Sequence, residues 1–245
     1  MEFLKKRKKT IAIIMTLAVV LTGMYICAQR HGDVMWTSAP DFAISAGQAI
    51  LIDADTGRVL YEKAADQRAY PASTTKIMTA LLTLEILEQY DSPIDQKVEI
   101  PAEAEGVEGS SLYLKAGEKI SIEDLLYGMM LVSGNDSAVA LSCIMGGTQQ
   151  HFIEMMNRRA EAIGCTGTHF ANPHGLHDEE HYTTVRDLVT ITQAALKSEN
   201  FRQIVDTYEY QLPDDNMRQN IPKLKTTNML IYRSLSNTLY YSRAH

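Results

Sequence analysis

The sequence predicts an α+β fold in which a β-hairpin is followed by a long helical region. Two β-rich stretches flank a turn-forming segment at residues 53–57, and apolar residues then recur at helical spacing between about residues 73 and 197. Hydrophobic residues make up 45% of the chain and charged residues 22%, which is typical of a globular protein and argues against disorder.

The predicted hairpin spans residues 48–62. Its two strands are separated by Asp53-Ala-Asp-Thr-Gly57. We expect Gly57 to take the turn position that needs a positive φ, because glycine has no Cβ to oppose that conformation.

The predicted helices rest on apolar periodicity and on residues that favour helix ends. Ser121 precedes two acidic residues and is a predicted N-cap, whereas Gly164 is a predicted C-cap. We expect helices over residues 73–90, from residue 121, over residues 137–145 and 148–163, and from Thr183 or Thr184 to about Lys197.

The N-terminal segment predicts export. Residues 5–9 are all basic, and an apolar run over residues 11–28 follows them, which is the pattern of a secretory signal. The run also approaches the ~20 residues that span a bilayer, so an uncleaved membrane anchor is the alternative for residues 1–28. Residues 29–44 are a predicted linker, and residues 45–245 are the predicted folded domain.

The rest of the chain is acidic. The formal net charge is −7, and the body is more acidic still because the basic cluster lies in the export segment. We therefore expect no nucleic-acid partner, since such binding depends on neutralising phosphates. Cys143 and Cys165 have no base patterned around them, and we interpret both as packed residues rather than nucleophiles.

Ser73-Thr-Thr-Lys76 is the first candidate for chemistry. Residues i and i+3 share one face of a helix, so the amine of Lys76 can reach the hydroxyl of Ser73. A serine hydroxyl is a weak nucleophile until a base takes its proton, and burial favours the neutral lysine that can do so. Pro71 and the apolar helix that follows give this short motif its context.

Ser133-Gly-Asn135 is the second candidate, at the end of the apolar stretch 125–132. We expect Gly134 to permit a tight turn out of the helix. The Ser133 hydroxyl can relay protons between the lysine and a leaving group, and the Asn135 amide can hold both the lysine and a substrate. The same spelling at Ser198-Glu-Asn200 is interpreted as a helix cap or turn.

These motifs resemble the penicillin-binding and serine β-lactamase superfamily. Within it, the chain is most similar to the low-molecular-mass D-alanyl-D-alanine carboxypeptidases, which are serine peptidases. The supporting stretches are residues 53–57, Pro71–Ala80, Leu131–Asp136 and Thr168–Leu176.

The resemblance implies a β-lactamase/transpeptidase-like fold with a helical region packed on an antiparallel sheet. It also implies removal of the terminal D-Ala from the stem pentapeptide of peptidoglycan, without a metal or other cofactor, and acylation by β-lactam antibiotics. The location it implies is the extracytoplasmic face of the membrane or cell wall, with membrane contact through the N-terminal segment or through a C-terminal region that this sequence lacks.

The resemblance also implies a role for each motif residue. Ser73 would be the acylated nucleophile and Lys76 its base. Ser133 would be the proton relay, and Asn135 the amide that positions the substrate. The backbone N–H of Ser73 would be one oxyanion donor.

The third motif of the family, Lys-Thr-Gly on a central strand, does not occur in the sequence, and Lys225-Thr-Thr227 is the nearest spelling. His245 falls about where that motif is expected to begin. We therefore expect a truncated chain that lacks C-terminal sheet strands, leaves the hairpin edge unpaired and is unstable or inactive alone. A non-catalytic penicillin-binding or wall-binding module is the alternative from another class.

Three other activities share parts of these patterns. His177-Asp-Glu-Glu-His181 spells H-x-x-E-H, with His169 and His174 nearby, but local signals place it in a loop of solvated residues rather than on a zinc-binding helix. A class A β-lactamase would use a glutamate for deacylation, and residues 170–176 hold none, so slow deacylation of penicillin is expected. An endopeptidase that cuts cross-links would share all of the motif residues.

Overall fold

The computed structural model describes residues 44–228 and residue 231. Contacts divide the chain into two units, Met1–Ser45 and Ala46–His245, and the fold described below is that of the second unit. The predicted signal or anchor and nearly all of the predicted linker lie outside the described residues. Within the described part, no helix combines the length and apolar character that crossing a membrane requires.

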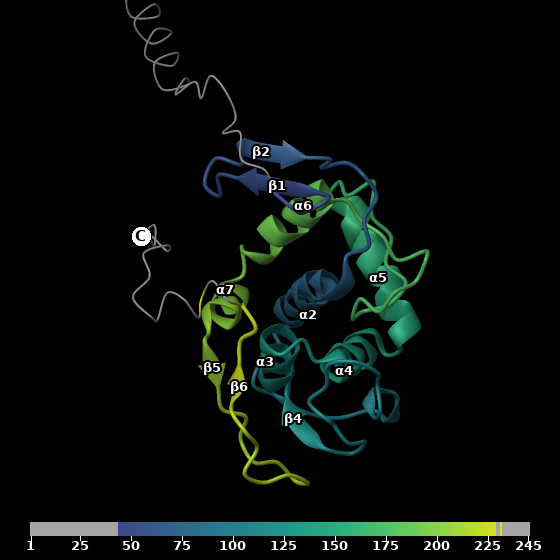
Figure 1. Cartoon of the computed structure of the whole chain (residues 1–245). Helices are drawn as coiled ribbons and strands as arrows, with labels where there is room; N and C mark the ends of the chain where they lie inside the picture. The colour runs from purple at the N-terminus through teal and green to yellow at the C-terminus, as the bar shows by residue number, and fades with distance from the viewer. Residues whose placement is uncertain (1–43, 229–230, 232–245) are drawn as a thin grey trace, which may run out of the picture. The chain divides into compact units, whose positions relative to one another are not determined.

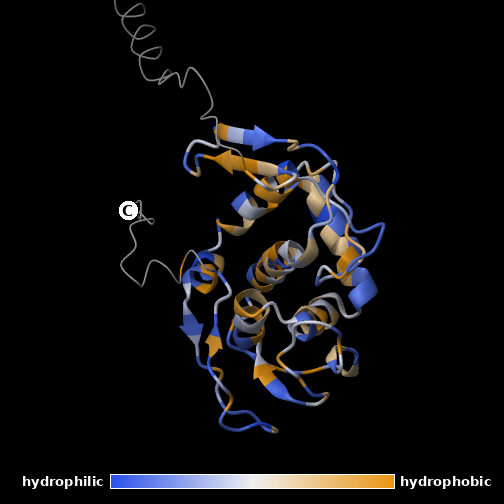
Figure 2. Cartoon of the chain, in the orientation of Figure 1, coloured by the Kyte–Doolittle hydropathy of each residue, from blue (hydrophilic) through white to orange (hydrophobic). Residues whose placement is uncertain are grey.

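The predicted hairpin is confirmed. Strands β1 (Ala49–Ile52) and β2 (Val59–Lys63) pair antiparallel, and Gly57 has φ +71 in the turn between them. β1 is apolar along its length, whereas β2 ends in hydrophilic residues (Figure 2). Among the described residues this hairpin is a two-stranded sheet, and it packs on helix α6 (Val185–Ala195) (Figure 1).

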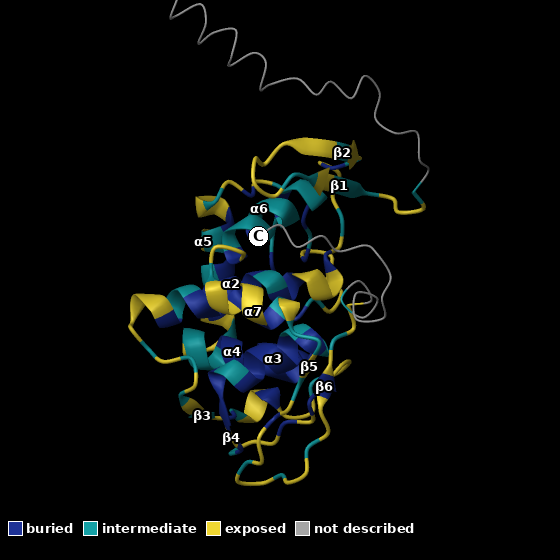
Figure 3. Ribbon diagram, turned by 90° about the vertical axis from the view of Figure 1, so that its left-hand side faces the viewer, coloured by how far each residue is buried: buried dark blue, intermediate teal, exposed yellow. Residues whose placement is uncertain are grey.

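Helix α2 (Lys76–Gln89) is the central helix of this unit. Its apolar residues surround most of its circumference, and a helix with that pattern is stable only when it is buried on several sides. Figures 1 and 3 show α2 among the other helices, with α3 and α4 largely buried beside it. The helices that contact α2 are α3 (Ile122–Leu131), α4 (Asn135–Gly146), α5 (Gln149–Ala162), α6 and α7 (Glu199–Asp206).

The predicted helix ends are largely confirmed. Ser121 and Asp124 form a capping box at the start of α3, and Thr184 caps α6. Gly164 has φ +89 just after α5, and Ser198 caps α7, as its interpretation as a cap predicts. α4 begins at Asn135, two residues before the predicted start.

Four short strands and α7 are not predicted from the sequence. Their lengths explain the omission of the strands, because two or three residues carry no measurable periodicity. The short strands are β3 (Lys97–Glu99), which pairs with β4 (Lys119–Ser121), and β5 (Glu209–Tyr210), which pairs with β6 (Leu224–Lys225).

Candidate active site

Ser73 lies in a 3-10 turn, η1 (Ala72–Thr75), that leads directly into α2. The proline ring of Pro71 restricts the backbone where the turn begins. Ala72 then adopts φ +48, in the left-handed region that residues other than glycine rarely occupy. The chain therefore turns sharply just before Ser73, which is exposed and accessible to a substrate.

Lys76 is the first residue of α2 and is only 2% exposed. Its Nζ lies 2.7 Å from Oδ1 of Asn135 and 2.6 Å from the carbonyl oxygen of His174. The same Nζ lies 3.3 Å from Oγ of Ser73. The structure thus brings the amine and the hydroxyl together, as their i, i+3 spacing predicts.

These contacts suit a neutral amine. The oxygens of Asn135 and His174 can only accept hydrogen bonds, so a neutral amine that donates its two N–H groups to them keeps its lone pair for the hydroxyl of Ser73. Burial lowers the pKa of Lys76 from 10.5 to about 8, although the charge of Asp136 acts in the opposite direction. A general base works best when its pKa lies near the working pH, and the site moves Lys76 toward that condition.

Ser133 lies between α3 and α4, and its hydroxyl donates to Oγ of Ser73 at 2.9 Å. The left-handed residue of this turn is Ser133, with φ +62, and Gly134 has φ −57. The expectation that Gly134 supplies the turn is therefore wrong. Glycine is favoured there by space instead, because a Cβ would lie 3.1 Å from Oδ1 of Asp136.

Asn135 is fixed by the protein on both sides of its amide. Oδ1 accepts from Lys76, and Nδ2 donates to the carbonyl oxygen of Glu108 at 2.7 Å. This pair of contacts determines which amide atom faces the lysine. Contact between Asn135 and a substrate, and the oxyanion role of the Ser73 N–H, stay predictions.

Several residues that shape the site are missed by motif reasoning. Asp136 is 1% exposed, and its carboxylate accepts from the backbone N–H groups of Leu112 and Leu114 at 3.1 Å each. Glu108 and His174 contribute backbone carbonyls, which no side-chain pattern can reveal. Asp136 could be recognised from the sequence, because an acidic residue in the first turn of a mostly apolar helix needs hydrogen-bond partners if it is buried.

Gly175 lets the loop over residues 172–176 rest directly on the turn that carries Ser73. Its φ is +93, and a Cβ at this position would lie 1.8 Å from the carbonyl oxygen of Ala72. Oδ1 of Asn172 accepts from the N–H of Gly175 at 2.6 Å. No side chain larger than hydrogen fits unless this loop or the turn that carries Ser73 moves.

The H-x-x-E-H stretch lies outside any helix, which confirms its prediction as a loop. Residues 177–180 are exposed, but His181 is 1% exposed, so its interpretation as a solvated residue is wrong. Its Nε2 bonds Oγ1 of Thr75 at 2.7 Å, and its Nδ1 accepts from the N–H of Ala171 at 2.9 Å. Burial lowers the pKa of His181 to about 4, so its ring is neutral. Through these two bonds the ring connects the loop at Ala171 to the turn that carries Ser73.

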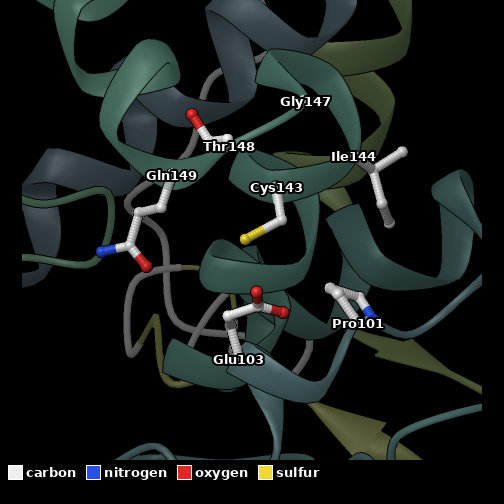
Figure 4. Close-up of a pocket in the computed structure, with 7 residues that line it drawn as sticks. All are labelled: Pro101, Glu103, Cys143, Ile144, Gly147, Thr148 and Gln149. Carbon is white, nitrogen blue, oxygen red and sulfur yellow. The ribbon is translucent and has the colours of Figure 1, made fainter.

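Cys143 borders a cavity of about 240 Å³ at the C-terminal end of α4 (Figure 4). Asn135 begins the same helix, so the cavity lies about 15 Å from that residue along the helix axis. Burial, with a smaller effect of Glu103, raises the pKa of Cys143, and burial raises that of Cys165 to about 11. Thiols with raised pKa values are poor nucleophiles, which agrees with their interpretation as packed residues.

The fold therefore brings together an accessible serine, a buried lysine one turn later and a second serine on a neighbouring turn, an arrangement in which a lysine can act as base for a serine nucleophile. The D-alanyl-D-alanine carboxypeptidase family matches residues 33–239, and the chain belongs to this family. The resemblance predicted from the sequence motifs is confirmed.

Relatives and solved structures agree with this assignment. D-alanyl-D-alanine carboxypeptidase DacF of Bacillus subtilis is 37% identical over 194 residues, which cover 78% of this chain and 49% of the relative. A Streptomyces D-alanyl-D-alanine carboxypeptidase is 36% identical over 202 residues, covering 78% of this chain and 68% of the relative. The chain thus spans about half the length of the first of these relatives.

The predicted α+β, transpeptidase-like fold is also confirmed. The crystal structure of penicillin binding protein 6B from Escherichia coli superposes with a TM-score of 0.73 at 28% identity, covering 82% of this chain and 63% of that one. A variant of the Streptomyces DD-transpeptidase superposes with a TM-score of 0.70 at 33% identity, covering 79% of this chain and 78% of that one.

Proposed function

We propose that this chain carries the acylation site of a serine D-alanyl-D-alanine carboxypeptidase, which removes the terminal D-Ala from the stem pentapeptide of peptidoglycan. The observation that carries the proposal is the environment of Lys76, a buried amine whose two N–H groups are engaged by acceptors and whose third contact is Oγ of Ser73. Membership of the family supports the choice of substrate.

In the proposed acylation, Oγ of Ser73 attacks the carbonyl carbon of the penultimate D-Ala while its proton passes to Nζ of Lys76. The tetrahedral intermediate collapses with cleavage of the peptide bond, and the nitrogen of the terminal D-Ala leaves with a proton. Ser133 is placed to hand its own proton to that nitrogen and to take the proton held by Lys76 in exchange, because its hydroxyl lies 2.9 Å from Oγ of Ser73. Asn135 holds Lys76 in position throughout.

In the proposed deacylation, water attacks the ester on Ser73 and the enzyme is regenerated with the shortened peptide released. A β-lactam acylates the same serine by opening its ring, so no leaving group departs. Residues 170–176 hold no glutamate that could activate water. The D-Ala that leaves the peptide makes room for water at the ester, whereas the opened β-lactam ring stays beside it, so a penicillin remains attached for a long time.

The proposed location is the outer face of the bacterial membrane, where peptidoglycan lies. Residues 1–28 are the proposed signal or anchor, residues 29–44 the linker and residues 45–245 the peptidase domain. The basic residues 5–9 before an apolar run support export.

The test uses the full 245-residue chain with a fluorescent penicillin and with a peptide ending in D-Ala-D-Ala. Because the acylation residues are assembled without the third motif, we expect covalent labelling and release of free D-alanine from the 245-residue chain, contrary to the expectation of an inactive chain, and neither from Ser73→Ala. Ser133→Ala should be labelled about 10²-fold or more slowly if its hydroxyl moves a proton.

A matched control is available in the second Ser-x-Asn sequence. Ser198→Ala removes a helix cap and should lower stability by about 1 kcal/mol while labelling proceeds normally. A folded chain that is not labelled, or a Ser73→Ala variant labelled like the parent, would refute the proposal. Absence of labelling from the folded chain would favour the non-catalytic binding module instead.

A further inference from the structure

The backbone of Leu112 connects the candidate active site to a distant part of the chain. Its N–H donates to Oδ1 of Asp136 at 3.1 Å, and its carbonyl oxygen accepts from Nη1 of Arg218 at 2.8 Å. Asp136 follows Asn135, the residue that holds Lys76. Leu112 is therefore held between the active site and an arginine more than a hundred positions later.

On the active-site side, residues 108–114 are bonded to the start of α4 at several points. The backbone N–H of Asn135 donates to the carbonyl oxygen of Ser110 at 2.7 Å, and its side-chain amide donates to that of Glu108. The carboxylate of Asp136 also accepts from Oγ of Ser111 at 2.7 Å. The orientation of the Asn135 amide thus depends on where this segment lies.

On the far side, Arg218 holds the same segment through a buried ion cluster. Its Nη2 donates to Glu118, whose side chain is fully buried, and its Nε lies 3.3 Å from the carboxylate of Asp215. The other carboxylate oxygen of Glu118 accepts from the N–H of Lys115 at 3.1 Å. Arg218 therefore contacts both ends of residues 112–118 with one planar group.

The cluster of Arg218, Glu118 and Asp215 is buried, unlike a surface ion pair, and can therefore hold residues 112–118 in place. Only 20% of the Arg218 side chain is exposed, and 4% of that of Asp215. Without Arg218 the carboxylates of Glu118 and Asp215 lose their cation; burial already raises the pKa of Glu118 to about 7, so the cluster must take up a proton, rearrange or admit water. The next turn adds a further link, because the N–H of Lys119 donates to Oδ1 of Asn216 at 2.5 Å.

We propose that Arg218 is a positioning residue for the acylation site: it fixes residues 112–118, so that Asn135 and Asp136 keep Lys76 in a dry position beside Ser73. This inference deepens the proposed function and rests on it. Arg218 itself contacts none of the motif residues and acts through the segment that it holds.

The test compares Arg218→Gln with Lys223→Gln in the full chain. Lys223 lies in the same C-terminal part of the described residues and pairs with exposed Glu209, so its variant loses one positive charge without touching residues 112–118. Two quantities are measured: amide hydrogen exchange of residues 110–118, and the rate of penicillin acylation as a function of pH.

For Arg218→Gln we expect exchange in residues 110–118 to rise at least about tenfold and acylation to slow by about 10- to 100-fold. We also expect the pH of half-maximal acylation to move upward, because water that reaches Lys76 returns its pKa toward the ordinary value. Asp136 and His174 are the titratable groups near Lys76, and neither is altered. Lys223→Gln should change none of these quantities.

Arg218→Lys keeps the charge between Glu118 and Asp215 and serves as the test if Arg218→Gln does not fold. A single ammonium cannot reproduce the planar set of donors, so we expect changes in the same direction but smaller. Faster exchange with an unshifted acylation profile would reduce Arg218 to a structural role and overturn the proposal, as would unchanged exchange. If the parent chain is not acylated, the proposed function fails, and the exchange data still decide whether Arg218 holds the segment.

Discussion

Lys76 and Arg186 are both cationic side chains that contact several oxygen atoms, yet the two regions treat charge in opposite ways. Lys76 is buried, and its partners are a carbonyl, an amide oxygen and a hydroxyl, all of them neutral. Arg186 has a side chain that is 38% exposed, and its partners are the carboxylates of Asp66 at 2.6 Å and Glu62 at 2.8 Å.

The pKa values follow this difference. Burial lowers the pKa of Lys76 to about 8, whereas hydrogen bonds to Asp66 and Glu62 raise that of Arg186. Burial among neutral acceptors favours the uncharged amine of Lys76, whereas carboxylates at the surface keep Arg186 charged. Arg186 joins the β1–β2 hairpin to α6, so its function is to connect elements, and Lys76 is placed to move protons.

Replacing Lys76 by methionine should have the largest effect. Met fills a similar volume but offers no lone pair, so acylation by penicillin should fall by about 10²- to 10⁴-fold, the range for loss of a general base. The measurement is the second-order rate of labelling. Lys97→Met, at an exposed position in β3, is the control and should label at the parent rate. Rapid labelling of Lys76→Met would show that acylation does not need the amine of Lys76, and the contrast drawn with Arg186 would fail.

Gly175→Ala tests whether the wall of the Lys76 site must be closely packed. The new Cβ would lie 1.8 Å from the carbonyl oxygen of Ala72, so either residues 172–176 or the turn that carries Ser73 must move. We expect labelling to slow by about 10²-fold, as a misplacement of ~1 Å at a reacting group does.

Gly164→Ala separates this clash from backbone strain. Gly164 also has a positive φ, +89, but a Cβ there meets no atom within 4 Å. Its variant should lose about 1 kcal/mol of stability and label normally. Equal labelling rates for both alanine variants would contradict a packing role for Gly175.

The pH dependence of acylation tests the lowered pKa directly. Only neutral Lys76 accepts a proton, so the rate should rise about tenfold per pH unit below pH 8 and level off above it. Arg186 cannot contribute, because its raised pKa keeps it charged throughout. A rate that is flat from about pH 6 to about pH 10 would contradict the assignment of Lys76 as the base.

Stability should depend on pH through the same group. The unfolded chain binds a proton at Lys76 up to about pH 10.5, and the folded chain only up to about pH 8. Between these values the unfolded state binds more protons, so the free energy of unfolding rises with pH. Below pH 8 the folded protein carries the full penalty, on the order of 3 kcal/mol, and Lys76→Met should lack this dependence in denaturant titrations at pH 7 and pH 10.

The sequence predicts the region around Lys76 better than the surroundings that tune it. Ser73 and Lys76 are related by helical spacing, and Gly57, Ser121 and Gly164 mark element ends by local chemistry, so each can be found from neighbouring residues alone. The same holds for the hairpin, whose strands are adjacent in the chain.

What the sequence does not reveal depends on contacts between distant positions. His181 looks like a loop residue until the fold buries it against Thr75, and the carbonyl groups of Glu108 and His174 have no side-chain signature. The bond from Arg218 to Leu112 joins residues 106 positions apart. Tertiary packing alone creates such pairs.

Arg186→Gln should have the smallest effect of these variants. It tests the exposed cation in the comparison with buried Lys76. It removes the ion pairs with Asp66 and Glu62, but exposed pairs contribute only about 0–1 kcal/mol because solvent screens them. We expect the free energy of unfolding to fall by no more than that and acylation to be unchanged, measured by denaturant titration and penicillin labelling. The loss should also shrink at high salt, since screening already weakens exposed pairs. A loss of several kcal/mol that persists in high salt would mean that the hairpin depends on Arg186 as strongly as the acylation site depends on burial of Lys76.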